Sequence, residues 1–280
     1  MSQGTRRRSL SFSSSAPPHP EFLSHLMEDE MLDVTITAVR RPQVLRTTLD
    51  SFFKNLFKST PCRAIINVDP VGLDVDSLRV VDVCREYFDE VVYNLPEEAN
   101  FSKAFKWCWS QVESDLVFHL EDDWELTQEV DLECLAGVLK KYRNIPYIRL
   151  PQFLSCLTTM KNWNKVFKWA GEFYMPPFNE KWLGFTGHPA LLKGDFVKHV
   201  APMLDVSLNP EKQFFQGGNT KLTEYCNQFW FVVYGVPAEP PTPPFVKDIG
   251  REWAVEHGFQ KADNKAHFLK WEKTNATNQS

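Results

Sequence analysis

The first 126 residues alternate between two kinds of hydrophobic pattern. Short apolar runs are typical of buried strands, and they occur at residues 32–39, 63–69, 89–94 and 115–120. Longer segments with apolar residues every three or four positions have the spacing of helices that bury one face, and they occur at residues 42–57, 74–88 and 96–112. Strands that alternate with helices in this way predict an α/β fold with a mostly parallel central sheet flanked by helices.

The pattern loosens after residue 126. We expect a helix at about residues 128–142, a short strand at 147–150 and a late strand at 228–235. An aromatic-rich segment runs from Trp163 to Trp182. Residues 1–30 are rich in Ser, Pro and Arg, which is typical of a disordered arm.

Polar side chains follow three of the predicted strands. The first strand leads into "TAVRRP", the second ends at Asp69, and the fourth runs into Glu121, Asp122 and Asp123. In a parallel sheet these strand ends meet at one edge, where ligands gather. Three adjacent carboxylates repel one another, so either water or a bound cation must stabilise them. The glycine-rich dinucleotide motif and the phosphate-binding loop of nucleoside triphosphatases are both absent from the sequence.

The composition and net charge argue against two classes of function. The chain has 280 residues, of which 43% are hydrophobic and 14% aromatic, enough to build a substantial core. It is therefore not a disordered adaptor. A net charge of -5 argues against broad electrostatic binding to nucleic acid.

Cysteine usage and the absence of long apolar runs bear on localisation. Six scattered cysteines form no C-x-x-C pair and no Cys/His cluster at zinc-ligand spacing, which favours reduced thiols in a cytosolic protein. No apolar run approaches the roughly 20 residues of a membrane span. The N-terminus lacks the apolar middle section of a signal peptide. We therefore expect a cytoplasmic protein without a membrane span.

Four motifs in order resemble the GT-A fold of nucleotide-sugar glycosyltransferases: "VTITAVRRPQVLRTTLDSF", "IINVD", "ANFSKAF" and "DLVFHLEDDW". They are similar to the family 2 enzymes and to N-acetylglucosaminyltransferases whose metal motif also reads E-D-D. The resemblance covers residues 32 to 126 and continues more weakly to about residue 253. It implies one GT-A domain at 31–260, made of a nucleotide-sugar-binding half at 31–126, an acceptor half at 127–236 and a lid at 237–260, with a C-terminal tail at 261–280.

The resemblance implies a divalent metal, Mn²⁺ or Mg²⁺, and a nucleoside-diphosphate sugar as donor. Asp123 would coordinate the metal, with Asp122 as a further candidate ligand, and Asp122 and Glu121 would lie near the ribose or a metal-bound water. Hard oxygen ligands suit such a cation, which neutralises the diphosphate leaving group. The family often adds a C-terminal histidine to the metal, and His257 is the nearest option here, with His267 the next.

Further residues match the donor side of the family. Asp69 matches the acid that hydrogen-bonds the nucleotide base. His188 and Arg251 are candidates for contacts with the donor or its diphosphate, because a guanidinium suits phosphate oxygens. The remaining donor-side matches are Thr37, Arg40, Asn100 and Lys103, and Arg41 is an alternative phosphate contact.

An inverting transfer also needs a base for the acceptor hydroxyl. Family members carry an acid at a helix start well after the metal motif, and "LNPEKQFF" offers Glu211. A helix N-terminus favours the ionised carboxylate that a base requires. Asp195 in "LLKGDF" is the second candidate, and a retaining outcome stays open.

The leading hypothesis is a metal-dependent glycosyltransferase that moves a sugar from a nucleotide sugar to an acceptor hydroxyl. The acceptor is a glycan, a lipid-linked sugar, a protein hydroxyl or a hydroxymethylated DNA base. The basic arm and the aromatic segment suit a DNA acceptor, whereas the acidic net charge opposes it. Two alternatives are a sugar-phosphate nucleotidyltransferase, although "TAVRRPQ" lacks the glycine-rich loop of that class, and a non-catalytic sugar-binding or scaffold protein.

Overall fold

A computed structural model describes residues 31–152, 167–176, 185–215, 218–235, 245–262 and 270–273. The arm predicted at residues 1–30 lies outside the described residues, and so do residues 163–166 and 177–182 of the aromatic segment. Within the described part, no helix combines the length and apolar character needed to cross a membrane.

The centre of the molecule is a nine-stranded sheet with the order β3-β2-β1-β4-β9-β6-β10-β8-β7. β3, β2, β1 and β4 run parallel, β9 runs antiparallel to both β4 and β6, and β10 is parallel to β6. The strands are β1 (Leu32–Arg40), β2 (Cys62–Gly72), β3 (Glu90–Asn94), β4 (Leu116–Glu121), β6 (Tyr147–Arg149), β7 (Phe167–Ala170), β8 (Phe173–Met175), β9 (Ala190–Lys193) and β10 (Phe231–Tyr234). The predicted α/β fold with a helix-flanked central sheet is confirmed.

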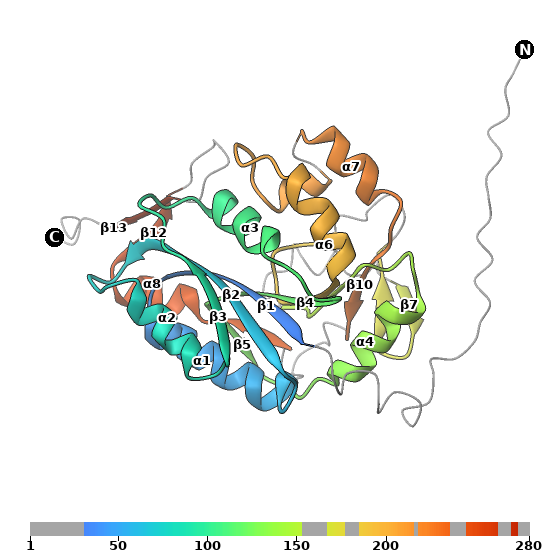
Figure 1. Cartoon of the computed structure of the whole chain (residues 1–280), viewed down its shortest axis with the longest axis horizontal. Helices are drawn as coiled ribbons and strands as arrows, with labels where there is room; N and C mark the ends of the chain where they lie inside the picture. The colour runs from blue at the N-terminus through green and yellow to red at the C-terminus, as the bar shows by residue number, and fades with distance from the viewer. Residues whose placement is uncertain are drawn as a thin grey trace, which may run out of the picture.

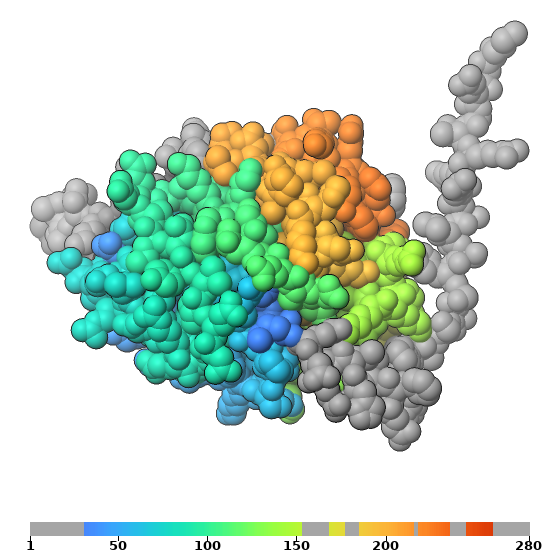
Figure 2. Space-filling model, in the orientation of Figure 1, coloured from blue at the N-terminus to red at the C-terminus, as the bar shows by residue number. Residues whose placement is uncertain are grey.

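Helices cover both faces of this sheet (Figure 1). α1, α2 and α4 bury apolar residues in one core cluster, and α3, α6 and α7 bury theirs in a second cluster across the sheet. In Figure 2 the green and orange surface in the upper part contains α3, α6 and α7, and the blue-to-teal surface at the lower left contains the segments from α1 to β3. The helices are α1 (Pro42–Phe52), continued by the π-helical turn Phe53–Phe57, α2 (Leu78–Arg85), α3 (Phe101–Ser110), α4 (Leu132–Lys141), α6 (Gly194–Val200) and α7 (Thr220–Cys226), with 3₁₀ turns at Ala201–Met203 and Lys212–Phe214.

Local sequence explains where several helices begin. α1 starts at Pro42, whose fixed φ and missing N–H suit the first helical position. Side-chain oxygens of Asn100, Asp131 and Asn219 accept hydrogen bonds from backbone N–H groups in the first turns of α3, α4 and α7. Such caps satisfy donors that have no partner inside the helix.

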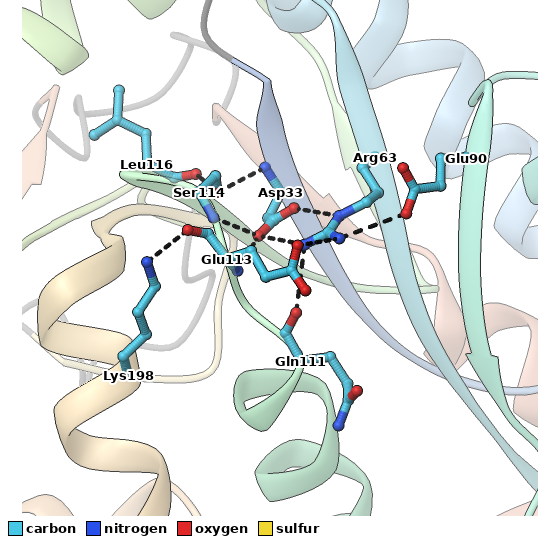
Figure 3. A network of polar contacts seen from close by, with 8 residues as sticks. All are labelled: Asp33, Arg63, Glu90, Gln111, Glu113, Ser114, Leu116 and Lys198. Carbon is cyan, nitrogen blue, oxygen red and sulfur yellow. Dashed lines mark hydrogen bonds and ion pairs between the residues drawn. The ribbon is translucent and has the colours of Figure 1, made fainter.

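A polar network fixes the amino-terminal edge of the sheet, opposite the strand ends that carry the acidic motif (Figure 3). Asp33 accepts hydrogen bonds from Arg63 Nε at 2.8 Å and from the backbone N–H of Glu113 at 2.7 Å and Ser114 at 3.0 Å. Burial alone would raise the pKa of Asp33, but these donors outweigh it and lower the pKa. The network therefore ties β1, β2 and the approach to β4 together.

The C-terminal segment is anchored to the acidic motif. β11 (Val246–Asp248) pairs antiparallel with β5 (Trp124–Leu126), the strand directly after Asp123. α8 (Gly250–Glu256) follows, and a hairpin of β12 (Phe259–Ala262) and β13 (Lys270–Lys273) comes next. The sequence predicts a lid for this segment and a tail after residue 260; among the described residues the segment forms the paired strand β11 and the helix α8, and β12 and β13 extend past residue 260.

Candidate functional site

A cleft of about 260 Å³ opens at the carboxyl ends of β1, β2 and β4. The sequence predicts a binding site at this edge, and seven of its candidate residues line the cleft: Thr37, Asp69, Asp122, Asp123, His188, Glu211 and Arg251. Glu121, Arg41 and Asp248 line it as well. The parallel strands β1, β2 and β4 bring Thr37, Asp69 and the acidic motif together because each strand ends at the same edge of the sheet, whereas His188, Glu211 and Arg251 come from later segments.

Asp122 is held tightly from three directions. Its Oδ1 accepts a hydrogen bond from Arg41 at 2.6 Å, and its Oδ2 accepts from Arg41 Nε at 2.9 Å and from the backbone N–H of Val39 at 3.0 Å. The Thr48 hydroxyl donates to the Asp122 carbonyl at 2.8 Å. Asp122 therefore fixes the loop after β1 against the acidic motif.

Asp123 shares the same guanidinium. Its Oδ2 lies 2.8 Å from Arg41, while its buried Oδ1 has no hydrogen-bond partner among the described residues. The Asp123 carbonyl accepts a hydrogen bond from the backbone N–H of Ile249 at 2.9 Å, just before α8. The Arg41 guanidinium also lies 5.6 Å from the ring centre of Trp253 on α8. The acidic motif thus joins β4 to the C-terminal segment.

The residues fit a divalent metal of a particular kind. Asp123 Oδ1 is a buried acceptor on the cleft wall that lacks a partner in the described part of the chain. No group of three or more His, Cys, Asp or Glu side chains there could hold a metal by itself. Magnesium-like ions, however, often use one or two carboxylates and take their other ligands from water and substrate phosphates. Asp123 therefore fits a cation that is shared with a diphosphate.

Asp69 lines the cleft and is held by hydrogen bonds that run from Asn94 through Asn67. Asn94 Nδ2 donates to Asn67 Oδ1 at 2.6 Å, and Asn67 Nδ2 donates to Asp69 Oδ1 at 2.8 Å. The backbone N–H of Asn100 donates to Asp69 Oδ2 at 3.0 Å. Burial raises the pKa of Asp69 to about 6, although these donors oppose the shift. Asp69 is therefore a buried acceptor whose pKa lies above that of an exposed aspartate.

Of the candidate residues at the end of β1, Thr37 and Arg41 line the cleft and Arg40 does not. Thr37 lines the cleft, and its buried hydroxyl has no partner among the described residues. Arg40, predicted to bind the donor, instead donates to Ser77 Oγ at 2.9 Å outside the cleft lining. A register shift after Val39 lets Arg41 point toward Asp122 and Asp123. Arg41 therefore occupies the position expected for Arg40.

Asn100 and Lys103 lie beside the cleft rather than on its wall. The Asn100 side chain caps α3 by accepting from the Lys103 backbone N–H at 2.9 Å. Both residues line an adjacent cavity of about 370 Å³, which shares Asp69 and Ala104 with the cleft. Asn100 acts on Asp69 through its backbone, so its side chain serves the helix instead of the donor pocket.

Glu211 lies on the wall of the cleft. It precedes a single 3₁₀ turn, Lys212–Phe214, instead of the helix that the sequence predicts, so the helix dipole contributes little. Its carboxylate instead accepts a short hydrogen bond from the backbone N–H of Gly187. A Cβ at Gly187 would lie 2.9 Å from Glu211 Oε1 and 3.0 Å from Glu121 Oε1. A side chain at position 187 would therefore push at least one of these two carboxylates aside.

Arg149 and Tyr147, which the sequence does not single out, hold Thr186, the residue that precedes Gly187. Arg149 on β6 donates to Thr186 Oγ1 at 3.1 Å, and the Tyr147 hydroxyl donates to the Thr186 carbonyl at 2.7 Å. The negative charge of Glu211 raises the pKa of Arg149, whereas burial, the larger effect, lowers it. The sequence does carry a signal for Arg149, because a charged residue inside the apolar run "YIRL" needs a polar partner when it is buried.

His188 and Arg251 also reach the cleft. The His188 ring lies 4.7 Å from the Trp124 ring, and its buried Nδ1 has no partner among the described residues. Burial, together with Arg149 and Arg251, lowers the pKa of His188 well below its usual range, so the ring is neutral. Arg251 is exposed and pairs with Asp248 at 2.8 Å. It therefore places a positive charge at the cleft.

Two predicted residues do not join the cleft lining. Asp195 lies in the first turn of α6, directly after β9. Because β9 runs antiparallel to β4, with Lys193 beside Leu116, α6 begins at the opposite edge of the sheet. His257 hydrogen-bonds the Trp253 carbonyl at 2.9 Å and stacks on the Trp253 ring. Neither a base role for Asp195 nor a metal role for His257 is supported by these positions.

Comparison with known proteins identifies the fold. No protein-family description matches the sequence, and no curated protein matches it. The S. aureus protein TarS, residues 1–349 in complex with UDP, is similar over 75% of this chain and 58% of its own, with 12% identity and a TM-score of 0.50.

Two other solved structures are similar. The mannosyltransferase PcManGT from Pyrobaculum calidifontis, in complex with GDP-Man and Mn²⁺, matches 64% of this chain and 49% of its own, with 9% identity and a TM-score of 0.48. The structure of GalNAc-T7 with UDP, GalNAc and Mn²⁺ matches 75% of this chain and 43% of its own, with 11% identity and a TM-score of 0.47. This chain spans less than two thirds of each matched chain. It has the GT-A fold, as the sequence predicts, and at these identities the likeness establishes the fold alone.

Proposed function

We propose that this protein is a metal-dependent, inverting glycosyltransferase that moves a sugar from a nucleoside-diphosphate sugar to an acceptor hydroxyl. The observation that carries the proposal is one cleft, at the strand ends of a GT-A fold, whose lining includes Asp69, Asp123 and Glu211. The structure of TarS, which is similar to this chain, is in complex with UDP, and this supports a nucleoside diphosphate as the leaving group.

The donor half would bind the nucleotide. Asp69 and the partnerless Thr37 hydroxyl are buried polar groups on the cleft wall, and a nucleoside offers matching donors and acceptors. Asp123 Oδ1 would hold Mn²⁺ or Mg²⁺, which supplies positive charge against the diphosphate. Arg251 would add a second cation from the C-terminal segment.

The acceptor half would supply the base. The acceptor oxygen forms a bond to the anomeric carbon, its proton passes to Glu211, and the bond from that carbon to the diphosphate oxygen breaks. The nucleoside diphosphate leaves with the bonding electrons. Gly187 orients the Glu211 carboxylate through its backbone N–H. The acceptor we propose is a glycan hydroxyl, because the net charge of -5 opposes binding to DNA.

The first experiment is thermal stabilisation by UDP, GDP and their sugar conjugates, with and without Mn²⁺. A ligand that binds only the folded protein raises its apparent stability, by about 2.7 kcal/mol at a hundred times the Kd. We expect a metal-dependent shift with one nucleotide, and Asp123→Asn should abolish its metal dependence. Absence of a shift with every donor would favour the non-catalytic alternative.

The second experiment separates chemistry from binding. Glu211→Gln should lower kcat by about 10² to 10⁴ while donor affinity is retained, which is the usual range for loss of a general base. Asp195→Asn is the matched control, because Asp195 is the other candidate acid but lies at the opposite sheet edge. Pyrophosphate release from a nucleoside triphosphate and a sugar phosphate would instead identify a nucleotidyltransferase.

A further inference from the structure

Arg41 is an internal cation at the place where the proposed function requires a metal. It contacts both Asp122 and Asp123 and lies almost completely buried. We propose that Arg41 makes metal binding conditional on the donor: the protein alone holds Mn²⁺ weakly, and the ion enters together with the diphosphate. This inference rests on the proposed function and adds to it an order of binding set by one residue.

The hydrogen bonds of the two aspartates leave few metal ligands. Both oxygens of Asp122 accept from Arg41, at 2.6 and 2.9 Å, and Oδ2 also accepts from the Val39 N–H. Asp123 Oδ2 lies 2.8 Å from Arg41. Asp123 Oδ1 is the one oxygen of the pair that has no partner among the described residues. A metal arriving alone would gain a single carboxylate oxygen from this pair.

Arg41 is locked in this position by the C-terminal segment. Its guanidinium lies 5.6 Å from the ring centre of Trp253, and a Cβ at Gly250 would lie only 2.7 Å from its Nη1. An arginine guanidinium stays protonated throughout the working pH range. The guanidinium therefore stays charged and has little room to move aside when a cation approaches.

A fixed positive charge opposes a free divalent ion but not an ion paired with a diphosphate. Two like charges a few Å apart repel strongly in a partly desolvated site. A diphosphate supplies both the missing oxygen ligands and negative charge that offsets Arg41 and the metal together. Metal and donor are therefore expected to bind cooperatively, with Arg41 as the source of much of that cooperativity.

The test measures Mn²⁺ binding directly, by electron paramagnetic resonance of the unbound ion. The protein is titrated with Mn²⁺ alone, with Mn²⁺ and UDP, and with Mn²⁺ and GDP, each corrected for binding of Mn²⁺ to the free nucleotide. We expect the better nucleotide to tighten Mn²⁺ binding by at least about tenfold, since a tenfold change needs only about 1.4 kcal/mol of coupling.

The variants isolate the guanidinium. Arg41→Met removes the charge at similar length, and it should tighten nucleotide-free Mn²⁺ binding by about tenfold or more because the aspartate oxygens become available. Arg41→Lys keeps a charge but presents a single ammonium in place of a fork, so it should give a smaller gain. Arg40→Met is the matched control: Arg40 binds Ser77 outside the cleft lining, and Mn²⁺ binding should not change.

Circular dichroism first establishes which variants fold, and Arg41→Lys carries the test if Arg41→Met does not. Equal Mn²⁺ affinity with and without nucleotide would overturn the inference while leaving the proposed function intact. Unchanged nucleotide-free affinity in the folded Arg41 variants would overturn it as well. Failure of Mn²⁺ to bind even with both nucleotides would refute the metal in the proposed function, and this inference with it.

Discussion

Gly250 lies directly against the carboxylate of Asp123: a Cβ added to this glycine would be 2.1 Å from Asp123 Oδ2. The start of α8 therefore packs on the acidic motif with no room for a side chain. This contact explains how a segment more than a hundred residues along the chain shapes the proposed metal site. It also makes the site sensitive to small changes in the C-terminal segment.

Gly250→Ala should weaken both the fold and the site. The added methyl group must displace Asp123 or Arg41, and overpacking of this kind costs about 1–3 kcal/mol. We expect a lower Tm and weaker Mn²⁺-dependent donor binding. Val255→Ala on the same helix is the control, because Val255 is 82% exposed. Wild-type donor binding in Gly250→Ala would contradict the close packing.

Gly187→Ala should instead affect turnover. The new Cβ would crowd the carboxylate ends of Glu211 and Glu121, which are side-chain tips that can move, so the fold should be little affected. We expect kcat to fall by about tenfold, equivalent to 1.4 kcal/mol, with unchanged donor affinity. In a Glu211→Gln background the same change should have little further effect, because both act on one group. Additive losses would show that Gly187 acts elsewhere.

Donor binding should depend on pH through Asp69. Its pKa is raised to about 6, chiefly by burial, so the carboxylate is ionised above that pH and protonated below it. If the ionised form accepts a hydrogen bond from the nucleotide base, donor affinity falls as the pH drops through about 6. Calorimetry from pH 5 to 8 measures this, and Asp69→Asn should bind more weakly and lose the pH dependence between these limits. A wild-type affinity that is flat across the range would exclude this role.

The network at the opposite edge should govern stability without affecting the site. Asp33→Asn leaves Arg63 without its closest carboxylate, and we expect a loss of about 2–4 kcal/mol in the free energy of unfolding near neutral pH. The pKa of Asp33 is lowered in the folded state. Its stabilising effect is therefore complete above the unfolded pKa of about 3.9 and is lost as the pH falls through the lower folded value.

Urea unfolding at pH 7 and pH 3 measures this difference between Asp33→Asn and wild type. The control is Glu90→Gln, because Glu90 pairs with the same arginine at 3.5 Å but is largely exposed; a change of less than about 1 kcal/mol is expected. A destabilisation by Glu90→Gln equal to that of Asp33→Asn would show that burial does not decide the strength of these pairs.

The sequence by itself determined the alternation of strands and helices and the edge of the sheet at which Asp69 and Asp123 gather. Both follow from local hydrophobic periodicity and from the geometry of parallel strands, which short segments encode. The Asn100 cap and the Pro42 helix start are equally local. For the same reason, the acidic motif could be located at a strand end before any tertiary contact was known.

Only the tertiary structure decided which candidates share the cleft. A register shift after Val39 turned Arg41 inward instead of Arg40, and the antiparallel direction of β9 carried Asp195 to the far edge. The roles of Arg149 and Gly250 rest on contacts with Thr186 and Asp123 that are distant along the chain. Strand direction, register and packing depend on pairings between remote segments, so no local pattern in the sequence specifies them.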